Sequence, residues 1–213
     1  KTGIINSLVY SGLSTGLDVF LGFTIGYLLA RTRLRGRAIL DTLAMLPLVI
    51  PGIVVAFSYF SAFSGTILDA RRNPVFLIVL SYSIRRLPYL VRSTYSSFQQ
   101  ISEHMEEASY NLGAGHATTF RRIVLPLVSP GLVAGGILVF AFSMLEVSSS
   151  LILAYRDRFY PITKVIYTLA GRVTDGPYAA SALGVVGMLL LGICFAFAFR
   201  ITSRRMGEFF RIG

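Results

Sequence analysis

Blocks of apolar residues long enough to cross a membrane constrain this fold more than any other feature of the sequence. About 20 residues of α-helix span the hydrocarbon layer, because each residue adds about 1.5 Å along the axis. Five such blocks lie at residues 4–30, 38–63, 75–98, 131–154 and 179–202. In lipid the backbone must satisfy its own hydrogen bonds, so these blocks predict an all-α integral membrane protein with five transmembrane helices.

The composition argues against several other classes of protein. The 213 residues are 54% hydrophobic and 14% charged, which is far from the balance of a soluble globular domain. The net charge is +10, but the basic residues are spread between the apolar blocks instead of forming one stripe with interleaved aromatic residues. We therefore expect no nucleic-acid partner. The one cysteine, Cys194, lies in an apolar run and cannot build a disulfide framework or a cysteine metal site.

The distribution of arginine and lysine predicts how the chain is oriented. Cytoplasmic loops of membrane proteins carry an excess of these residues. The loop at 31–37, the segment at 99–130 and the C-terminal tail after residue 202 are therefore placed in the cytoplasm. The loops at 64–74 and 155–178 then lie outside, although they also carry some basic residues, so the bias is modest.

The sequence reads as one domain, residues 1–213, because no internal repeat or low-complexity linker divides it. It begins at Lys1 without a methionine, and the predicted orientation puts this end outside. We therefore expect a piece of a longer chain that lacks an upstream helix or a fused half. Pro47, Pro51 and Gly52 should kink the second helix, which favours a packed bundle over a simple anchor.

The most polar long stretch of the chain, residues 102–126, predicts a helix, a sharp turn and a second helix. Ser102 is a suitable N-cap for the first helix, and the glycine-rich run at 113–115 should end it. The second helix is expected to end at Pro126. By pattern alone the stretch is either an interfacial amphipathic connector or a docking surface for a cytoplasmic partner.

The spacing within this stretch resembles a known signature. Glu107-Ala108-Ser109, three residues, Gly113, nine residues and then Ile-Val-Leu-Pro at 123–126 resemble the EAA signature of permease subunits of type I, binding-protein-dependent ABC importers. The one departure is Ser109, where that family usually has a second alanine. The "LPLVIPG" helix and the two spans after the signature also fit that fold, so the resemblance covers nearly the whole chain.

This resemblance implies a role and a set of partners. In such permeases the signature forms coupling helices that seat in a cleft of the ATP-hydrolysing subunit. The implied contact residues here are Glu106, Glu107, Ala108, Ser109, Leu112, Gly113 and Ala114, with Glu107 as charged anchor and Gly113 as the turn. The implied partners are two ABC ATPase subunits, a second permease domain (identical, homologous or fused), a periplasmic or lipid-anchored solute-binding protein and membrane lipid. The implied location is a bacterial or archaeal inner membrane.

The solute is less well defined than the class of transporter. The stretches "SYSIRRLPYLVRSTYSSF" and "LEVSSSLILAYRD" resemble the ferric-iron permeases most, but phosphonate, thiamine, polyamine and sulfate permeases are also similar. The outer loop at 155–178 is rich in tyrosine, and it is either an interfacial connector or a contact for the binding protein.

Four charged residues fall inside predicted spans: Asp18, Arg85, Arg86 and Glu146. A charge at the bilayer centre costs about 2.5–3.5 kcal/mol on insertion scales, so these side chains should face the interior and pair. Arg85, Arg86 and Glu146, together with Ser149, are candidates for lining the translocation path. The alternative is a structural ion pair that locks the third helix against the fourth.

Several catalytic patterns are absent from the sequence. It contains no G-x-x-x-x-G-K-[ST] loop, so we expect no ATP hydrolysis and no cofactor in this chain. His104 and His116 lack the partners of a metal site, and no nucleophile elbow or paired carboxylates occur. We therefore expect a transporter subunit and no enzyme. The competing hypotheses are an ATP-independent channel or secondary transporter and an intramembrane enzyme.

Overall fold

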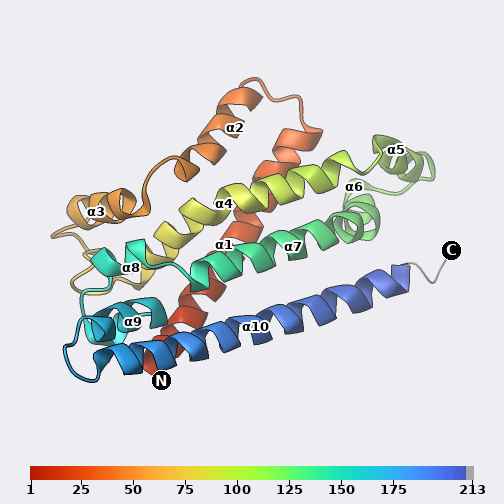
Figure 1. Cartoon of the computed structure of the whole chain (residues 1–213). Helices are drawn as coiled ribbons and strands as arrows, with labels where there is room; N and C mark the ends of the chain where they lie inside the picture. Colours follow the sequence, from red (N-terminus) through yellow and green to blue (C-terminus); the bar gives the residue numbers. More distant parts are fainter. Residues whose placement is uncertain (210–213) are drawn as a thin grey trace.

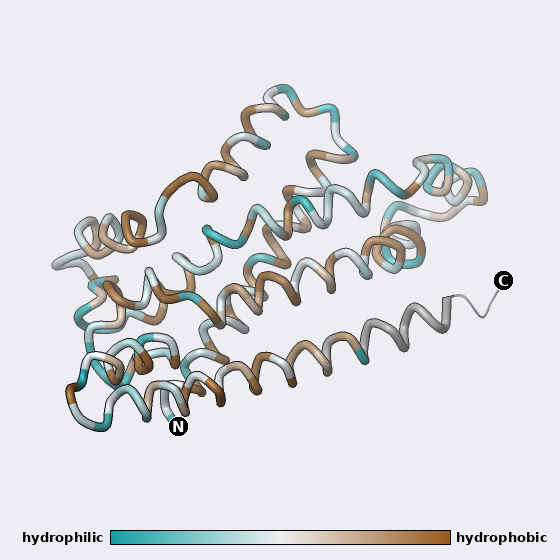
Figure 2. Tube along the Cα trace, viewed as in Figure 1, coloured by the Kyte–Doolittle hydropathy of each residue, from teal (hydrophilic) through white to brown (hydrophobic). Residues whose placement is uncertain are grey.

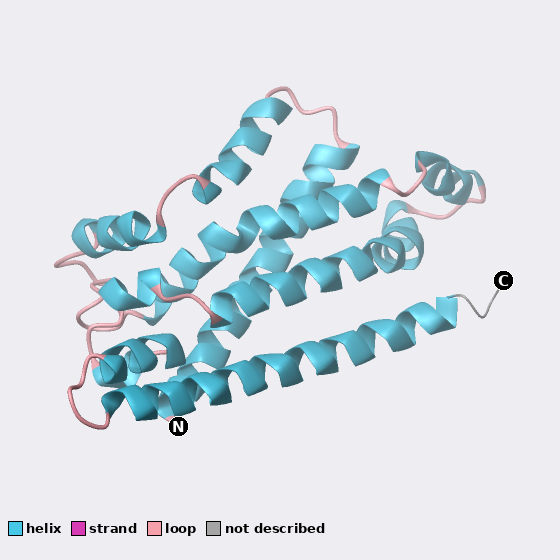
Figure 3. Cartoon of the chain, viewed as in Figure 1, coloured by secondary structure: helices cyan, strands magenta, loops and turns pink. Residues whose placement is uncertain are grey.

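A computed structural model describes residues 1–209, and all regular structure in this part of the chain is helical (Figures 1 and 3). The α-helices are α1 (Thr2–Arg31), α2 (Arg37–Met45), α3 (Gly52–Ala62), α4 (Val75–Gln99), α5 (Glu103–Asn111), α6 (His116–Thr119), α7 (Leu125–Met144), α8 (Ser148–Leu153), α9 (Ile162–Ala170) and α10 (Gly176–Phe209). Short 3-10 turns η1 (Leu46–Leu48) and η3 (Asp157–Phe159) and a π-helical turn η2 (Phe120–Val124) complete the chain. The predicted all-α fold is confirmed.

The core of the bundle is formed by α1, α4 and α7, which pack against one another. Two glycines of α1, Gly22 and Gly26, allow this close approach. A Cβ atom on Gly22 would lie 2.9 Å from Leu90 Cδ2, and one on Gly26 would lie 2.8 Å from Thr94 Cβ. Small residues four apart are a common device for helix contact in membranes, because packing replaces the hydrophobic drive that lipid cannot supply.

The other helices cover this core from two sides. In Figure 1, α2 and α3 lie on the side of α4, and α10 runs along α7 on the opposite side. Apolar side chains remain exposed on the outer helices of both sides, for example Phe57 on α3 and Met188 on α10. Figure 2 shows brown segments along these outer helices, as expected for surfaces that face lipid or another membrane subunit.

Three helical stretches are long and apolar enough to cross a membrane: Thr2–Arg31, His116–Met144 and Gly176–Ala196. A fourth span is obtained when Arg37–Leu48 and Gly52–Ala62 are counted together, although they are bent by 98° at the break between them. The remaining predicted span is the helix α4, which is long enough to cross a membrane but carries three arginines and is not counted among these apolar stretches. Five spans therefore stay a prediction.

Two predicted boundaries are wrong. The fourth span was expected at 131–154, but the helix ends at Met144, and the chain turns before the short helix α8. The second helix of the polar stretch was expected to end at Pro126, but it continues through η2 into α7. Pro126 has no N–H for the carbonyl four residues earlier, and the wider π turn directly before it accommodates this loss within a continuous helix.

The loops sort to two ends of the bundle as the sequence predicts (Figure 1). The loop at 31–37 and the segment at 99–124 lie at one end, where α10 also finishes, and the loops at 64–74 and 155–175 lie at the other. The last residues of the tail, 210–213, are outside the described part of the chain. Which end faces the cytoplasm stays a prediction.

Candidate functional site

The polar stretch forms a capped helix followed by a tight turn. The Ser102 hydroxyl accepts a hydrogen bond from the His104 N–H at 3.3 Å, which is the expected N-cap of α5. The chain reverses at Gly113, whose φ of +83° lies in the left-handed region that glycine adopts without steric cost. The Gly113 N–H donates to Tyr110 O at 2.9 Å, and the Ala114 N–H donates to Ser109 O at 3.1 Å. These bonds satisfy the last carbonyls of α5.

Side chains on both sides of the turn hold the two helices together. The hydroxyls of Ser109 and Thr119 are hydrogen-bonded at 2.9 Å. The rings of Tyr110 and His116 lie 4.8 Å apart between their centroids. Ser109, which departs from the resembled signature, is therefore used inside the turn, because an alanine could not bond to Thr119.

The helix–turn–helix segment, residues 102–124, is joined to the bundle at two places. Arg31, the last residue of α1, pairs through its Nε with Glu106 Oε1 at 3.2 Å, and its Nη2 donates to Ile101 O at 2.8 Å. At the other end of the segment, η2 runs directly into α7. A displacement of the segment would therefore move both α1 and α7.

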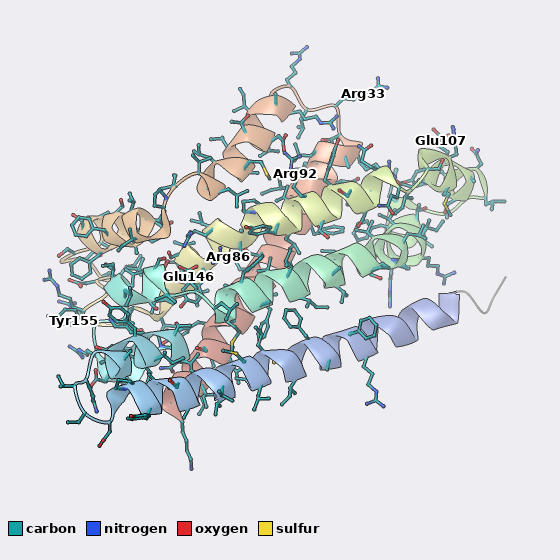
Figure 4. The ribbon with its side chains drawn as sticks, in the orientation of Figure 1. Arg33, Arg86, Arg92, Glu107, Glu146 and Tyr155 are labelled. Atoms are coloured by element: carbon teal, nitrogen blue, oxygen red, sulfur yellow. The ribbon has the colours of Figure 1, made fainter. Side chains whose placement is uncertain are left out.

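The residues predicted to contact a partner differ in their exposure. Glu107, Ala108, Leu112 and Gly113 are exposed, and Leu112 retains 89% of its accessible surface. Figure 4 shows Glu107 at the outer tip of α5. Ser109 and Ala114 are half-buried, and Glu106 turns inward to its ion pair with Arg31. Only some of the predicted contact residues are therefore exposed to a partner.

Arg85, Arg86 and Glu146, the buried charge cluster, come together inside the bundle. Arg85 Nη1 lies 2.9 Å from Glu146 Oε1, and Arg86 Nη2 binds Glu146 Oε2. The Glu146 side chain is only 3% exposed, so a buried carboxylate is shared by two half-buried guanidinium groups. Figure 4 shows Arg86 and Glu146 facing each other between α4 and the end of α7.

The other buried polar side chains make bonds of their own. Asp18 is fully buried on α1 and accepts a hydrogen bond from Ser83 of α4, so the expected ion pair is replaced by a hydroxyl partner. Ser149 is also fully buried, and its hydroxyl lies 2.8 Å from that of Ser81. These contacts join α1 to α4 and α4 to α8.

The charge cluster also fixes the short helix α8. Glu146 Oε1 accepts a bond from the Ser149 N–H at 3.3 Å, at the positive end of the α8 dipole. At the opposite end, Lys164 Nζ donates to Leu151 O at 2.9 Å and to Ala154 O at 2.6 Å. The helix therefore carries an anion at its start and a cation at its end. Burial lowers the pKa of Lys164.

Sequence reasoning missed Lys164 and the packing role of Gly52. Lys164 stands alone in the apolar run "ITKVIYTLAG", and this isolation was the available signal. A Cβ atom on Gly52 would lie 1.9 Å from Arg85 Nη1, so the helix break at Pro51 admits a guanidinium against the backbone. Gly52 had been expected only to kink the helix.

Comparisons with known proteins identify relatives over most of the chain. A family model described as binding-protein-dependent transport system inner membrane component matches residues 22–208. A probable molybdenum ABC transporter permease of Haloferax volcanii is 32% identical over 206 residues, covering 89% of this chain and 73% of that protein. A putative ferric transport system permease of Haemophilus influenzae is 32% identical over 160 residues, covering 75% of this chain and 25% of that protein.

Solved structures share the fold. The MetNI methionine ABC transporter, in inward-facing conformations, matches with a TM-score of 0.74 and 16% identity over 95% of this chain and 94% of that chain. A bacterial alginate ABC transporter in complex with an alginate-bound periplasmic protein matches with a TM-score of 0.73 and 19% identity, covering 95% and 78%. The chain therefore belongs to the family of binding-protein-dependent transport system inner membrane components, the multi-pass cell-membrane permeases of ABC transporters.

Proposed function

We propose that this chain is the transmembrane permease of an ATP-driven importer, in which a separate subunit hydrolyses ATP and a binding protein delivers the solute. The observation that carries the proposal is the helix–turn–helix segment, which exposes Glu107, Ala108 and Leu112 at one end of the bundle while Arg31 and η2 join it to α1 and α7. A partner that moves this segment would move two core helices. Family membership favours this function over an ATP-independent channel or an intramembrane enzyme.

The permease is expected to act with a second copy or a related permease domain. The apolar surface of α3 supports this, because large side chains such as Val54 and Phe57 are exposed there at 49% and 63%. The buried charge cluster lies next to α3, through the contact of Arg85 with Gly52. We therefore place the translocation path on this side, with Arg85, Arg86 and Glu146 as its gate rather than as a structural lock alone.

For the solute we propose an oxyanion of the molybdate or tungstate type, with ferric iron as the second candidate. The permeases named for molybdenum, molybdate or tungstate match over 71–73% of their own length in Haloferax volcanii and Pyrococcus abyssi. The ferric permease of Haemophilus influenzae matches over 25% of its length. Two arginines beside the path also suit an anion better than a cation.

The docking role is tested by replacing Leu112, which is so exposed that its loss leaves the fold intact. In Leu112→Asp we expect at least a tenfold loss of retention of the ATPase subunit on the affinity-purified permease. Ile67→Asp is the matched control, because Ile67 is 93% exposed at the opposite end of the bundle. Equal retention by Leu112→Asp and the wild type would contradict docking at this segment.

The transport proposal is tested with the complex in liposomes that hold ATP inside, with molybdate-loaded binding protein added outside. ATP-dependent accumulation of molybdate, measured by elemental mass spectrometry, is the expected result. Accumulation of ferric iron with no molybdate uptake would favour the second candidate. Uptake of either solute without ATP would overturn the importer function.

A further inference from the structure

A pocket of about 320 Å³ lies where α1, α2 and α4 meet, apart from the helix–turn–helix segment and the charge cluster. Its lining residues are Leu29, Arg37, Ala38, Asp41, Arg92 and Tyr95. We refer to it as the α2 pocket. Nothing in the transport function proposed above assigns it a ligand.

The polar groups of the α2 pocket carry an excess of positive charge. Arg37 Nη2 donates to the Tyr95 hydroxyl at 2.9 Å, and its guanidinium lies 5.8 Å from the centroid of the Tyr95 ring. Arg92 Nη2 pairs with Asp41 Oδ1 at 3.0 Å. Two cations thus face one carboxylate. The Arg92 and Asp41 side chains are 48% and 37% exposed, so an incoming ligand can reach them.

The position of the pocket along the bundle indicates the boundary between hydrocarbon and water. Leu29 lies two residues before the end of the apolar span formed by α1, which finishes at Arg31. The basic loop at 31–37 follows directly, and Figure 4 shows Arg33 in this loop and Arg92 below it between α2 and α4. Arginines at this depth meet the phosphate groups of the bilayer.

The helix α2 beside the pocket is amphipathic. Leu40 and Ala44 pack inward against the cluster that contains Leu29. Ile39 and Leu43, one turn apart, instead point outward with 66% and 59% of their surface exposed. An apolar face next to a cationic pocket is the arrangement by which an interfacial helix lies among lipid molecules.

We propose that the α2 pocket binds the phosphate diester of an anionic phospholipid, with the phosphate between Arg37 and Arg92 and the acyl chains along Ile39 and Leu43. A free phosphate ion would use the same two guanidinium groups. The apolar face and the depth of the pocket favour the lipid, because neither feature adds to the binding free energy of a soluble ion.

The proposal is tested by titrating the detergent-purified protein with phosphatidylglycerol and counting bound lipid by native mass spectrometry. Removing one charge-assisted contact should cost about 1.5 kcal/mol, so Arg37→Gln is expected to weaken binding about tenfold. Asp41→Asn should strengthen binding, because it releases Arg92 from its ion pair. Arg33→Gln is the control: it removes the same charge from the loop directly before α2, but Arg33 does not line the pocket.

Each result decides for or against the site. Tenfold weaker binding in Arg37→Gln, tighter binding in Asp41→Asn and less than a twofold change in Arg33→Gln would support it. Equal losses in Arg37→Gln and Arg33→Gln would show diffuse attraction and overturn it, as would an unchanged affinity in Arg37→Gln or Asp41→Asn. Displacement by millimolar inorganic phosphate would assign the pocket to a soluble ion. Equal binding of phosphatidylcholine would also overturn the proposal.

Discussion

Several of the polar contacts inside the bundle converge on Glu146. Its carboxylate accepts hydrogen bonds from Arg85, Arg86 and the Ser149 N–H. Its backbone carbonyl oxygen accepts hydrogen bonds from the hydroxyls of Thr163 at 2.7 Å and Tyr82 at 3.4 Å. A charge that is removed from water in this way is tolerated only when its partners are complete. The residue therefore couples α4 to α8 and α9 whether or not solute passes beside it.

Removing the negative charge of this carboxylate should destabilise the fold. Glu146→Gln keeps the shape but leaves two guanidinium groups without a counter-charge, so the free energy of unfolding should fall by roughly 3 kcal/mol. Unfolding in mixed detergent, followed by circular dichroism, measures the change. Glu107→Gln is the control, because Glu107 is 65% exposed and should change stability by less than about 0.5 kcal/mol. Similar stabilities for the two variants would show that the cluster is not structural.

At the scale of elements, the turn between α5 and α6 depends on one backbone conformation. Gly113 has a φ of +83°, whereas Gly115, two residues later, has a φ of −74°. A Cβ atom at either position meets no neighbouring atom within 4 Å, so the two glycines differ in backbone angle and not in space.

This difference gives a matched pair of variants. Gly113→Ala should lower the stability of the turn by about 1–2 kcal/mol, because alanine disfavours the left-handed region. Gly115→Ala should leave it nearly unchanged. Hydrogen exchange at the amides of residues 109–114 measures the effect, with faster exchange expected only in the first variant. Equal exchange in both would mean that the turn has another conformation in the membrane.

The loop between α3 and α4 is held by Asp69. Its Oδ2 accepts from the Gly65 N–H and its Oδ1 from the Arg71 N–H, each at 2.8 Å. These two bonds lower the pKa of the carboxyl below its usual range, the Gly65 bond having the larger effect. The pKa of Asp69 is therefore lower in the folded protein than in the unfolded chain. The carboxylate stabilises the fold at pH values above the pKa of the unfolded chain, and this stabilisation is lost as the pH falls through the pKa of the folded state.

The resulting prediction is a pH dependence that Asp69→Asn removes. The thermal midpoint of the wild type should exceed that of the variant at pH 6, and the two midpoints should converge below about pH 4 as Asp69 is protonated. Thermal unfolding in detergent between pH 3 and pH 7 measures both curves. Parallel curves over the whole range would exclude a contribution from this carboxylate.

At the scale of the whole molecule, the two loop ends should lie on opposite sides of the membrane. We expect Val173→Cys to react with an impermeant maleimide in intact cells, and Arg33→Cys to react only in inverted vesicles, both in a Cys194→Ser background. The reason is the excess of basic residues on the side of Arg33. Val173 is 98% exposed, so its thiol would be accessible. Labelling of both variants from one side would contradict the topology.

Features that depend on neighbouring residues could be predicted from the sequence, and those that depend on distant contacts could not. The Ser102 cap and the turn at Gly113 follow from local residue types, and the first and last apolar blocks became α1 and α10. The inward turn of Glu106 depends on Arg31, far away in sequence, so it has no local signal. The same holds for the end of the helix at Met144, since Glu146 is held by α4.

The π-helical turn at 120–124 has a consequence for how such a chain can vary. A π turn holds one residue more than an α turn, so it behaves as a single-residue insertion within the helix from His116 to Met144. Deleting one residue there would restore an ordinary α-helix while the segments on either side keep nearly the same relative orientation, because the π turn already takes up the extra residue. A deletion in the α-helical part of α7 would instead rotate everything before it by about 100° around the α7 axis. The direction in which α5 faces therefore tolerates the loss of one residue at the π turn and not in the helix that follows it.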